Sequence, residues 1–201
     1  MNDGSGISPG RDWGEPGTVP GDIVICRGDA EAAAAAAHVG LSGGDLHRSL
    51  GSPPVPVAGG SSTILEVDLM SCEVETDRGR MFVTAVSHVL VGRFMGIGRF
   101  TGCVNTGFVG GRNLTPRSHP GDGRIEEFTV DPGMRKRERF VAVRRSSTGT
   151  HLPHPMITVS VLREWETARH GREILTIDGT RIPRWRRVAV RVNPAGLTVH
   201  V

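Results

Sequence analysis

Residues 116–125 read PRSHPGDGRI, residues 149–155 read GTHLPHP and residues 177–179 read IDG. Each motif alone is a weak signal, because Gly/Asp turns, His-Pro loops and Asp-Gly hairpins occur in many folds. The sequence between the motifs is rich in short runs of strand-forming residues. Three turn motifs in a fixed order, joined by strand-rich sequence, predict a mainly β fold for this part of the chain.

The composition limits the class of protein. The chain has 201 residues, enough for one hydrophobic core or for one domain plus a fragment. Its 28 Gly and 13 Pro favour many turns and short strands over a helical bundle. No stretch approaches the roughly 18 apolar residues of a membrane span, and the first residues do not resemble a signal peptide. Cys26, Cys72 and Cys103 show neither metal-site nor disulfide spacing, so a cytoplasmic protein is expected.

The charge pattern bears on partners. The net charge of +3 is too small to indicate a nucleic-acid partner, and the 4% aromatic content, without Tyr, offers few rings for stacking on bases. We therefore expect no nucleic acid as partner. Basic side chains cluster at 135–145 and 181–187. The simplest interpretation is a solvated surface. The alternative is peripheral contact with anionic lipid headgroups, each basic residue contributing about 1 kcal/mol near such a surface.

The first third of the chain is punctuated by Gly and Pro. Residues 1–20 are Gly/Pro/Asp-rich and are predicted to be disordered. Residues 22–26 predict a short buried strand. The six alanines at 32–37 predict a helix, with Asp29 as its N-cap and Gly40 after its end. A second short helix is expected near 46–50, and residues 51–62 are the clearest linker in the chain.

Beyond the linker, apolar residues recur at every second position, as in half-buried strands. One helix interrupts them, with Asp131 as its cap and Gly149 at its end. Asp178-Gly179 predicts a hairpin between strand 173–177 and the strand near 188. We expect a two-layer β-sandwich over 63–201. Strands are predicted at 65–69, 81–91, 103–109, 125–130, 156–162, 173–177, 188–192 and 197–201.

Taken together, the three motifs resemble the C-terminal half of the diacylglycerol kinase family of bacterial lipid kinases. The likeness runs from about residue 22 to residue 201 and is best from residue 63 onward. It implies a β-sandwich domain preceded by an α/β nucleotide-binding domain, of which residues 21–62 would be a truncated remnant. It also implies ATP and Mg²⁺ as cofactors and a lipid hydroxyl as phosphoryl acceptor.

The resemblance implies a catalytic role for Asp178. Family members carry Asp-Gly-Glu at this place, and the aspartate is implicated as the base for the lipid hydroxyl. A carboxylate suits this role, because it accepts the proton as the hydroxyl oxygen attacks the γ-phosphate. Thr180 replaces the glutamate of the family motif. Spacing alone supports the plainer interpretation, a hairpin turn.

A nucleotide site is implied by two further segments. The family's Gly-Gly-Asp-Gly-Thr, whose glycines let the backbone approach phosphates, corresponds to residues 27–31, RGDAE. The family's Gly-Thr-Gly-Asn-Asp corresponds to the segment before Leu46. The resemblance thus places around the nucleotide the residues Gly28, Asp29, Gly43, Gly44 and Asp45. The residues themselves indicate only a helix cap and a glycine turn, and Glu31 would bring negative charge close to a phosphate.

The loop at 119–124 resembles a structural Mg²⁺ site of the same family. By position, the ion would be held by the backbone of His119, the carboxylate of Asp122 and the backbone of Arg124, oxygen ligands of the kind that hard cations prefer. Gly121 replaces the first of the two acids usual there. The plainer interpretation is a tight loop. The His-x-x-His at 151–154 lies on a Pro-bearing loop without further ligands at zinc-site spacing, which favours an ordered loop over a metal site.

Two functions remain open from the sequence. The chain is either an ATP-dependent lipid kinase with Asp178 as its base, or a non-catalytic lipid- or partner-binding module derived from one. The altered glycine motif and the absent first α/β elements favour the module. Asp178 and the ordered motif series favour the kinase. Either function is compatible with a homo-oligomer or a partner chain.

Overall fold

The computed structural model describes residues 13–35, 38–93 and 98–201. The predicted disorder at 1–20 falls mostly on residues 1–12, which lie outside the described residues. Glu15–Thr18, however, forms strand β1 and pairs antiparallel with β4 (Ser61–Thr76). The expectation of disorder is wrong for this strand, because its backbone groups find partners along β4.

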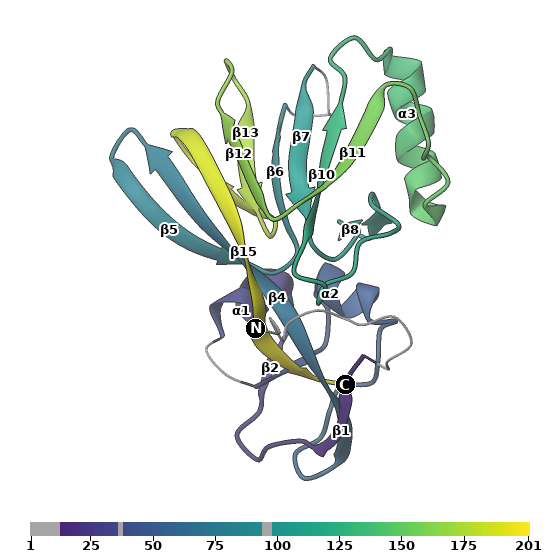
Figure 1. The fold of residues 1–201 in the computed structure, drawn as a ribbon, viewed down its shortest axis with the longest axis vertical. Coiled ribbons are helices and arrows are strands. Elements are labelled where there is room, and N and C mark those ends of the chain that lie inside the picture. Colours follow the sequence, from purple (N-terminus) through teal and green to yellow (C-terminus); the bar gives the residue numbers. More distant parts are fainter. Residues whose placement is uncertain (1–12, 36–37, 94–97) are drawn as a thin grey trace, which may run out of the picture.

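The fold is mainly β, as predicted (Figure 1). After β1, a small α/β unit contains β2 (Val24–Cys26), α1 (Asp29–Ala34), β3 (Val39–Leu41) and α2 (Gly44–Ser49). The strands from β4 onward are β5 (Gly79–Ala85), β6 (His88–Gly92), β7 (Phe100–Val104), β8 (Phe108–Val109), β9 (Arg112–Asn113), β10 (Ile125–Val130), β11 (Ile157–Leu162), β12 (Glu164–Ala168), β13 (Ile174–Ile177), β14 (Thr180–Ile182) and β15 (Trp185–His200). Between β10 and β11 lie helix α3 (Lys136–Arg145) and the short 3-10 helix η2 (Ser146–Thr148).

Two large sheets form the sandwich. One has the order β1-β4-β15-β3-β2, with β5 added beside β4 and β12 beside β15. The other has the order β11-β10-β7-β6-β13-β14. Figure 1 shows the two layers diverging above the point where β4 and β15 pass into the α/β unit. Between the layers lies the main core. Its tryptophan Trp185 is 1% exposed and donates its indole N–H to the Glu173 carbonyl oxygen.

Strands β4 and β15 are 16 residues each and belong to both parts of the molecule. The upper end of β4 supplies Met70, Cys72 and Val74 to the main core. Its lower end supplies Leu65 and Val67 to a second core beneath α1 and α2. Strand β15 does the same, with a register shift between Asn193 and Leu197. The division into 21–62 and 63–201 stays a prediction, and across it the two units share these strands.

Three local expectations differ from the structure. Gly40, expected to follow a helix, lies in β3, and a Cβ there would come 2.4 Å from Cγ of Pro56 in the linker. The long helix begins at Lys136 and not near Asp131, whose carboxylate instead accepts the Gly133 amide in a turn. The Asp178-Gly179 hairpin joins β13 to β14, because the chain turns again before β15 begins.

Helix α3 covers the outer face of the second sheet (Figure 1). Beneath it lies a third apolar cluster built from Phe128, Val130, Met134, Ala142 and Ile157. Ala142 is the one buried residue of α3. Among the described helices, none is long and apolar enough to cross a membrane.

Gly102, in the middle of β7, tests the packing of the second sheet. A Cβ at this position would lie 2.3 Å from the Val89 carbonyl oxygen and 3.0 Å from Cα of Leu90, both on the neighbouring strand β6. We expect Gly102→Ala to lower the free energy of unfolding by roughly 2–4 kcal/mol, because backbone must move to admit the methyl group. Denaturant unfolding of the purified protein measures this. Gly21→Ala, where a Cβ meets open space, is the control. Equal loss in both variants would contradict the close approach of the two strands.

Candidate functional site

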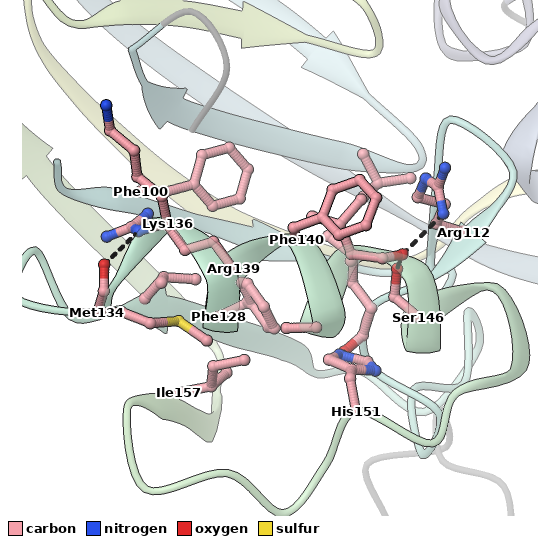
Figure 2. Close-up of a pocket in the computed structure, with 15 residues that line it drawn as sticks. Phe100, Arg112, Phe128, Met134, Lys136, Arg139, Phe140, Ser146, His151 and Ile157 are labelled. Carbon is pink, nitrogen blue, oxygen red and sulfur yellow. Dashed lines mark hydrogen bonds between the residues drawn. The ribbon is translucent and has the colours of Figure 1, made fainter. Parts of the chain in front are cut away.

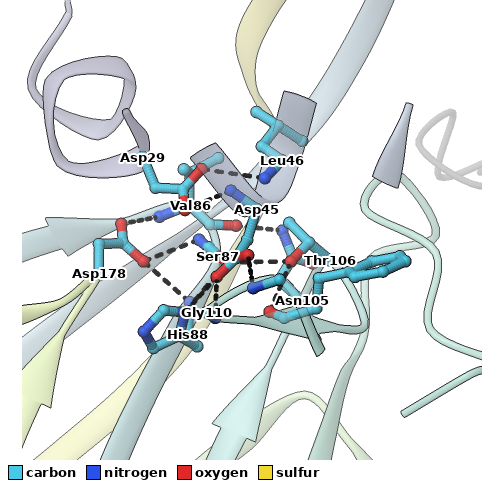
Figure 3. A network of polar contacts seen from close by, with 12 residues as sticks. Asp29, Asp45, Leu46, Val86, Ser87, His88, Asn105, Thr106, Gly110 and Asp178 are labelled. Atoms are coloured by element: carbon cyan, nitrogen blue, oxygen red, sulfur yellow. Dashed lines mark hydrogen bonds and ion pairs between the residues drawn. The ribbon is translucent and has the colours of Figure 1, made fainter. Parts of the chain in front are cut away.

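A network of buried carboxylates lies where the α/β unit meets the sandwich (Figure 3). Asp178 stands at its edge, in the β13–β14 turn, with φ 44°. Its carboxylate accepts the backbone amides of Val86 at 2.7 Å, Ser87 at 3.0 Å and His88 at 2.8 Å. These amides belong to the turn at which the chain leaves β5 in one sheet and enters β6 in the other. Asp178 therefore holds the crossing between the two sheets.

The pKa of Asp178 is shifted by competing effects. Desolvation raises the pKa of this carboxyl above its ordinary value, and the nearby Asp29 adds to the increase. His88 and the amide hydrogens act in the opposite direction. A raised pKa suits a proton acceptor, but both carboxylate oxygens already accept hydrogen bonds. The catalytic role of Asp178 stays a prediction.

Asp29 binds α2, although the sequence predicted that it would cap the alanine helix. Its two carboxylate oxygens accept the amides of Asp45 at 2.8 Å and Leu46 at 2.9 Å. Gly44 makes this approach feasible, because a Cβ there would lie 2.4 Å from Oδ1 of Asp29 and the residue has φ +98°. At Gly43, a Cβ would lie 2.7 Å from the Arg27 carbonyl oxygen. Contacts within the chain thus account for both glycines without a phosphate.

Asp45 joins the α/β unit to the β8–β9 hairpin. Its carboxylate accepts the amides of Gly110 at 2.6 Å and Gly111 at 2.8 Å. Nδ1 of His88 lies 3.8 Å from Oδ2 of Asp45 and 3.1 Å from the Ser87 hydroxyl. The structure therefore brings the predicted residues Asp29, Asp45 and Asp178 together, and adds His88 to them.

Asp29, Asp45 and His88 are the residues of this network best placed to hold a cation. One ligand atom from each lies within 4.8 Å of the others, and all three side chains are buried. The donor types suit a divalent metal ion. All four carboxylate oxygens already accept a backbone amide each. An ion bound here would have to share those oxygens with the amides.

In residues 27–31, where the resemblance implies a phosphate-binding loop, the carboxylate of Glu31 occupies a backbone amide of the loop itself. Oε2 of Glu31 accepts the Arg27 amide at 2.6 Å, directly before Gly28. Gly28 has an extended φ of −164°, and a Cβ there would meet nothing within 4 Å. This position therefore does not require glycine. A phosphate approaching these residues would meet the Glu31 carboxylate at the first amide of the loop.

The predicted metal loop contacts an acid that the sequence analysis missed. Asp68, on β4 and 1% exposed, accepts the amides of Gly123 at 2.6 Å and Ala195 at 3.0 Å. Asp122 accepts the Arg124 amide, and His119 accepts the Gly121 amide. These contacts place N–H groups toward the acids of the loop. Asp68 adds a carboxylate beside the loop, and the Mg²⁺ assignment to His119, Asp122 and Arg124 stays a prediction.

Glu126 lies behind the same loop and is 5% exposed. Burial raises the pKa of its carboxyl to about 7, and the charge of Asp122 adds to the increase. Burial also raises the pKa of both Asp68 and Asp122. In this second acidic cluster, the carboxyl of Glu126 therefore keeps its proton up to about pH 7, and burial shifts the pKa of its two neighbours in the same direction.

A separate apolar cavity of about 550 Å³ lies between α3 and the outer face of the second sheet (Figure 2). Its floor contains Phe100, Phe128 and Ile157, and α3 contributes Phe140 and Val143 to its wall. Cationic side chains border it, namely Arg112, Lys136 and Arg139. Cavities of this size and character usually bind small apolar molecules.

His151 gives the cavity one polar feature. Its side chain is buried, and Nε2 lies 3.1 Å from the Leu114 carbonyl oxygen. A carbonyl only accepts, so Nε2 carries the proton and Nδ1 is left as an acceptor. Among the described residues Nδ1 has no hydrogen-bond partner. Burial lowers the pKa of His151, which keeps the ring neutral at neutral pH. The sequence placed His151 in an ordered loop and did not indicate the cavity.

Several functional candidates were outside the reach of sequence reasoning. His88, Asp68 and Glu126 each lie in a strand or at its end, without a motif around them. Asn105 donates to the Asp68 and Val86 carbonyl oxygens and links the two acidic clusters. The period-two pattern identifies such residues only as strand positions. The one sequence signal for a functional role at these positions is a polar residue where the pattern expects an inward-facing apolar one.

Comparisons with known proteins support the fold. No family model and no curated protein sequence matches the chain. The structure is similar to that of a candidate diacylglycerol kinase from Bacillus anthracis strain Sterne, with a TM-score of 0.55 and 11% identity, covering 89% of this chain and 77% of that chain. A diacylglycerol kinase structure from the same strain has a TM-score of 0.50 and 11% identity, with 81% and 66% covered. Yeast NADH kinase in complex with NADH has a TM-score of 0.54 and 9% identity, with 89% and 60% covered.

At these identities the likeness concerns the fold alone. The chain has the fold shared by these kinases, a mainly β sandwich adjoining an α/β unit. The predicted fold class and the predicted likeness to the diacylglycerol kinase fold are therefore confirmed.

Removal of the Asp178 carboxylate tests its structural role. Asp178→Ala leaves three backbone amides without an acceptor, so we expect it to lower the free energy of unfolding by roughly 2–4 kcal/mol. Asp178→Asn keeps one acceptor oxygen, and we expect a smaller loss. Urea unfolding measures both. Asp77→Ala is the control, because Asp77 is an exposed acid in another hairpin, paired with Arg186. If Asp178→Ala were as stable as Asp77→Ala, the carboxylate would not hold the crossing.

Glu126 predicts a pH dependence of stability. Its pKa is about 7 in the folded protein, against an ordinary value near 4.5. Between these values the unfolded chain loses the proton while the folded chain keeps it, so stability falls as the pH rises. Glu126→Gln removes this contribution. From about pH 4.5 to 7.5 we expect the variant to gain on the order of 2–3 kcal/mol relative to the parent protein. Unfolding curves of both proteins across this pH range measure the effect. A difference in the free energy of unfolding between variant and parent that does not change with pH would contradict the buried, protonated state of Glu126.

Proposed function

We propose that the chain is a lipid-binding module with the fold of a lipid kinase, and that the cavity beneath α3 holds the apolar part of the lipid. The observation that carries the proposal is the cavity of about 550 Å³ with an aromatic and aliphatic lining. Its cationic border suits an anionic or strongly polar headgroup. The unpartnered acceptor on His151 suits a ligand that carries a hydroxyl group.

The carboxylate network supports binding over catalysis. Asp29, Asp45 and Asp178 direct both oxygens at backbone amides and connect segments of the chain. Glu31 takes the first amide of the loop in which phosphates were expected. These contacts assign the acids a role in holding the fold together.

Phosphoryl transfer is the second candidate function. It is favoured by the meeting of Asp29, Asp45 and His88, whose ligand atoms lie within 4.8 Å of one another, and by the likeness in fold to kinases. In that function Asp29 and Asp45 would hold Mg²⁺, which neutralises phosphate charge. Asp178 would hold the proton of the acceptor hydroxyl at its carboxylate.

Binding of a fluorescent fatty acid tests the cavity. We expect the full chain to bind it with saturation, and Val143→Trp to weaken binding at least tenfold, because the indole narrows a cavity that Val143 lines. Val143 is 51% exposed, so the substitution leaves the core intact. Ala58→Trp, on an exposed turn, is the control. The same affinity in all three proteins would exclude the cavity as the binding site.

Calorimetry with ATP and Mg²⁺ separates the two candidates. We expect no binding at millimolar nucleotide, because internal carboxylates already take the amides that phosphates would need. Saturable binding that is lost in Asp45→Asn would instead favour the kinase function. A lipid kinase assay with Asp178→Asn would then test the base.

A further inference from the structure

Helix α3 carries three exposed apolar side chains, which together form an apolar patch. Phe140 is 70% exposed, Val143 51% and Val141 46%. The helix buries Ala142 instead, directly between two of these residues in sequence. An exposed aromatic ring beside aliphatic side chains on a surface helix marks an interaction site.

The charges around this patch are positive. In a helix the neighbours of Phe140 lie three and four residues away, and three of these four are Lys136, Arg137 and Arg144. Residues 135–145 carry six basic side chains and one carboxylate, Glu138. Among the described ion pairs, none involves these three cations.

The second basic run differs in this respect. Arg186 pairs with Asp77, and Arg187 pairs with Glu166 and Glu75. Two of the four arginines of 181–187 are therefore paired with carboxylates within the chain. On α3, the three cations around the exposed phenyl ring have no such partner among the described ion pairs.

The apolar patch is continuous with the cavity. Phe140 and Val143 belong to the patch and also line the cavity, together with Lys136 (Figure 2). A surface that covers the patch would therefore meet the entrance of the cavity. This arrangement suits a ligand that comes from a lipid layer better than one that comes from water.

We propose that α3 docks on an anionic lipid bilayer, with Phe140 inserted among the acyl chains and Lys136, Arg137 and Arg144 at the phosphates. The proposal deepens the lipid-binding function and rests on it, because docking opens the cavity toward the membrane. Insertion of a phenyl ring contributes about tenfold or more to affinity. Each cation near the surface adds about fivefold.

Sedimentation with vesicles tests the docking surface. Vesicles of phosphatidylcholine alone are compared with vesicles in which phosphatidylserine replaces a third of it. We expect the full chain to bind the second kind and to be released by salt. We expect Phe140→Ser to lose about tenfold in affinity. Phe82→Ser is the matched control, because Phe82 is 78% exposed on β5, opposite Glu73, and should have no effect.

Three results would overturn the proposal. They are equal binding of both vesicle types, equal binding by Phe140→Ser and the parent protein, and no binding of either vesicle type. The first result would show that the cations do not contribute to binding, and the second that the phenyl ring does not. The third would exclude any lipid layer of this composition as the partner, leaving a protein or nucleic acid for the patch.

A charge variant separates this proposal from the cavity function. Arg137 and Arg144 do not line the cavity. We expect the double variant Arg137→Glu, Arg144→Glu to lose vesicle binding at least 25-fold, by the same fivefold per cation, and to keep the affinity for the fluorescent fatty acid. Fatty-acid binding without vesicle binding in the parent protein would refute the docking surface alone. Vesicle binding without fatty-acid binding would refute the cavity function alone.

Discussion

The antiparallel pairing of β4 with β15 is the interaction on which the rest of the structure depends. Each strand is long enough to serve the sandwich at one end and the α/β unit at the other. β5 and β12 pair with their upper ends, and β1 and β3 with their lower ends. By pairing with these neighbours, β4 and β15 bring together segments that are far apart in the sequence.

Buried and half-buried carboxylates add further contacts between segments that are far apart in the sequence. Asp178, Asp45 and Asp68 each reach across from one element to backbone amides of a distant one. A charged acceptor bonds amides more strongly than a neutral one, and the low dielectric of the interior increases the effect. The same burial raises the pKa of Asp178 and Asp68. Acids that resemble catalytic residues in the sequence thus act here as connectors.

The sequence was sufficient for the fold class and for most strands, because period-two alternation and Asp-Gly turns depend on neighbouring residues. The structure brings Asp29, Asp45 and Asp178 close together, and the nucleotide-binding and catalytic roles given to them stay predictions. The sequence did not show what their carboxylates bind, because the partners, such as Gly110 and Val86, are distant in sequence. The sequence did not indicate the cavity either, because its lining residues are also distant from one another in sequence. α3 covers the cavity with Ala142 as its one buried residue, while Phe140 lines the cavity and stays 70% exposed. A helical pattern of Phe and Val predicts instead that the phenyl ring is buried.

The β8–β9 hairpin connects the cavity beneath α3 with the carboxylate network. Val109 and Arg112 line the cavity, and the two glycines between them give their amides to Asp45. Four consecutive residues thus lead from the lining of the cavity to the α/β unit. If binding in the cavity shifted this hairpin, the Asp45 carboxylate at the start of α2 would lose or move its two amide donors. By thermodynamic linkage, whatever then binds or orders the α/β unit must change the affinity for the ligand by the same factor.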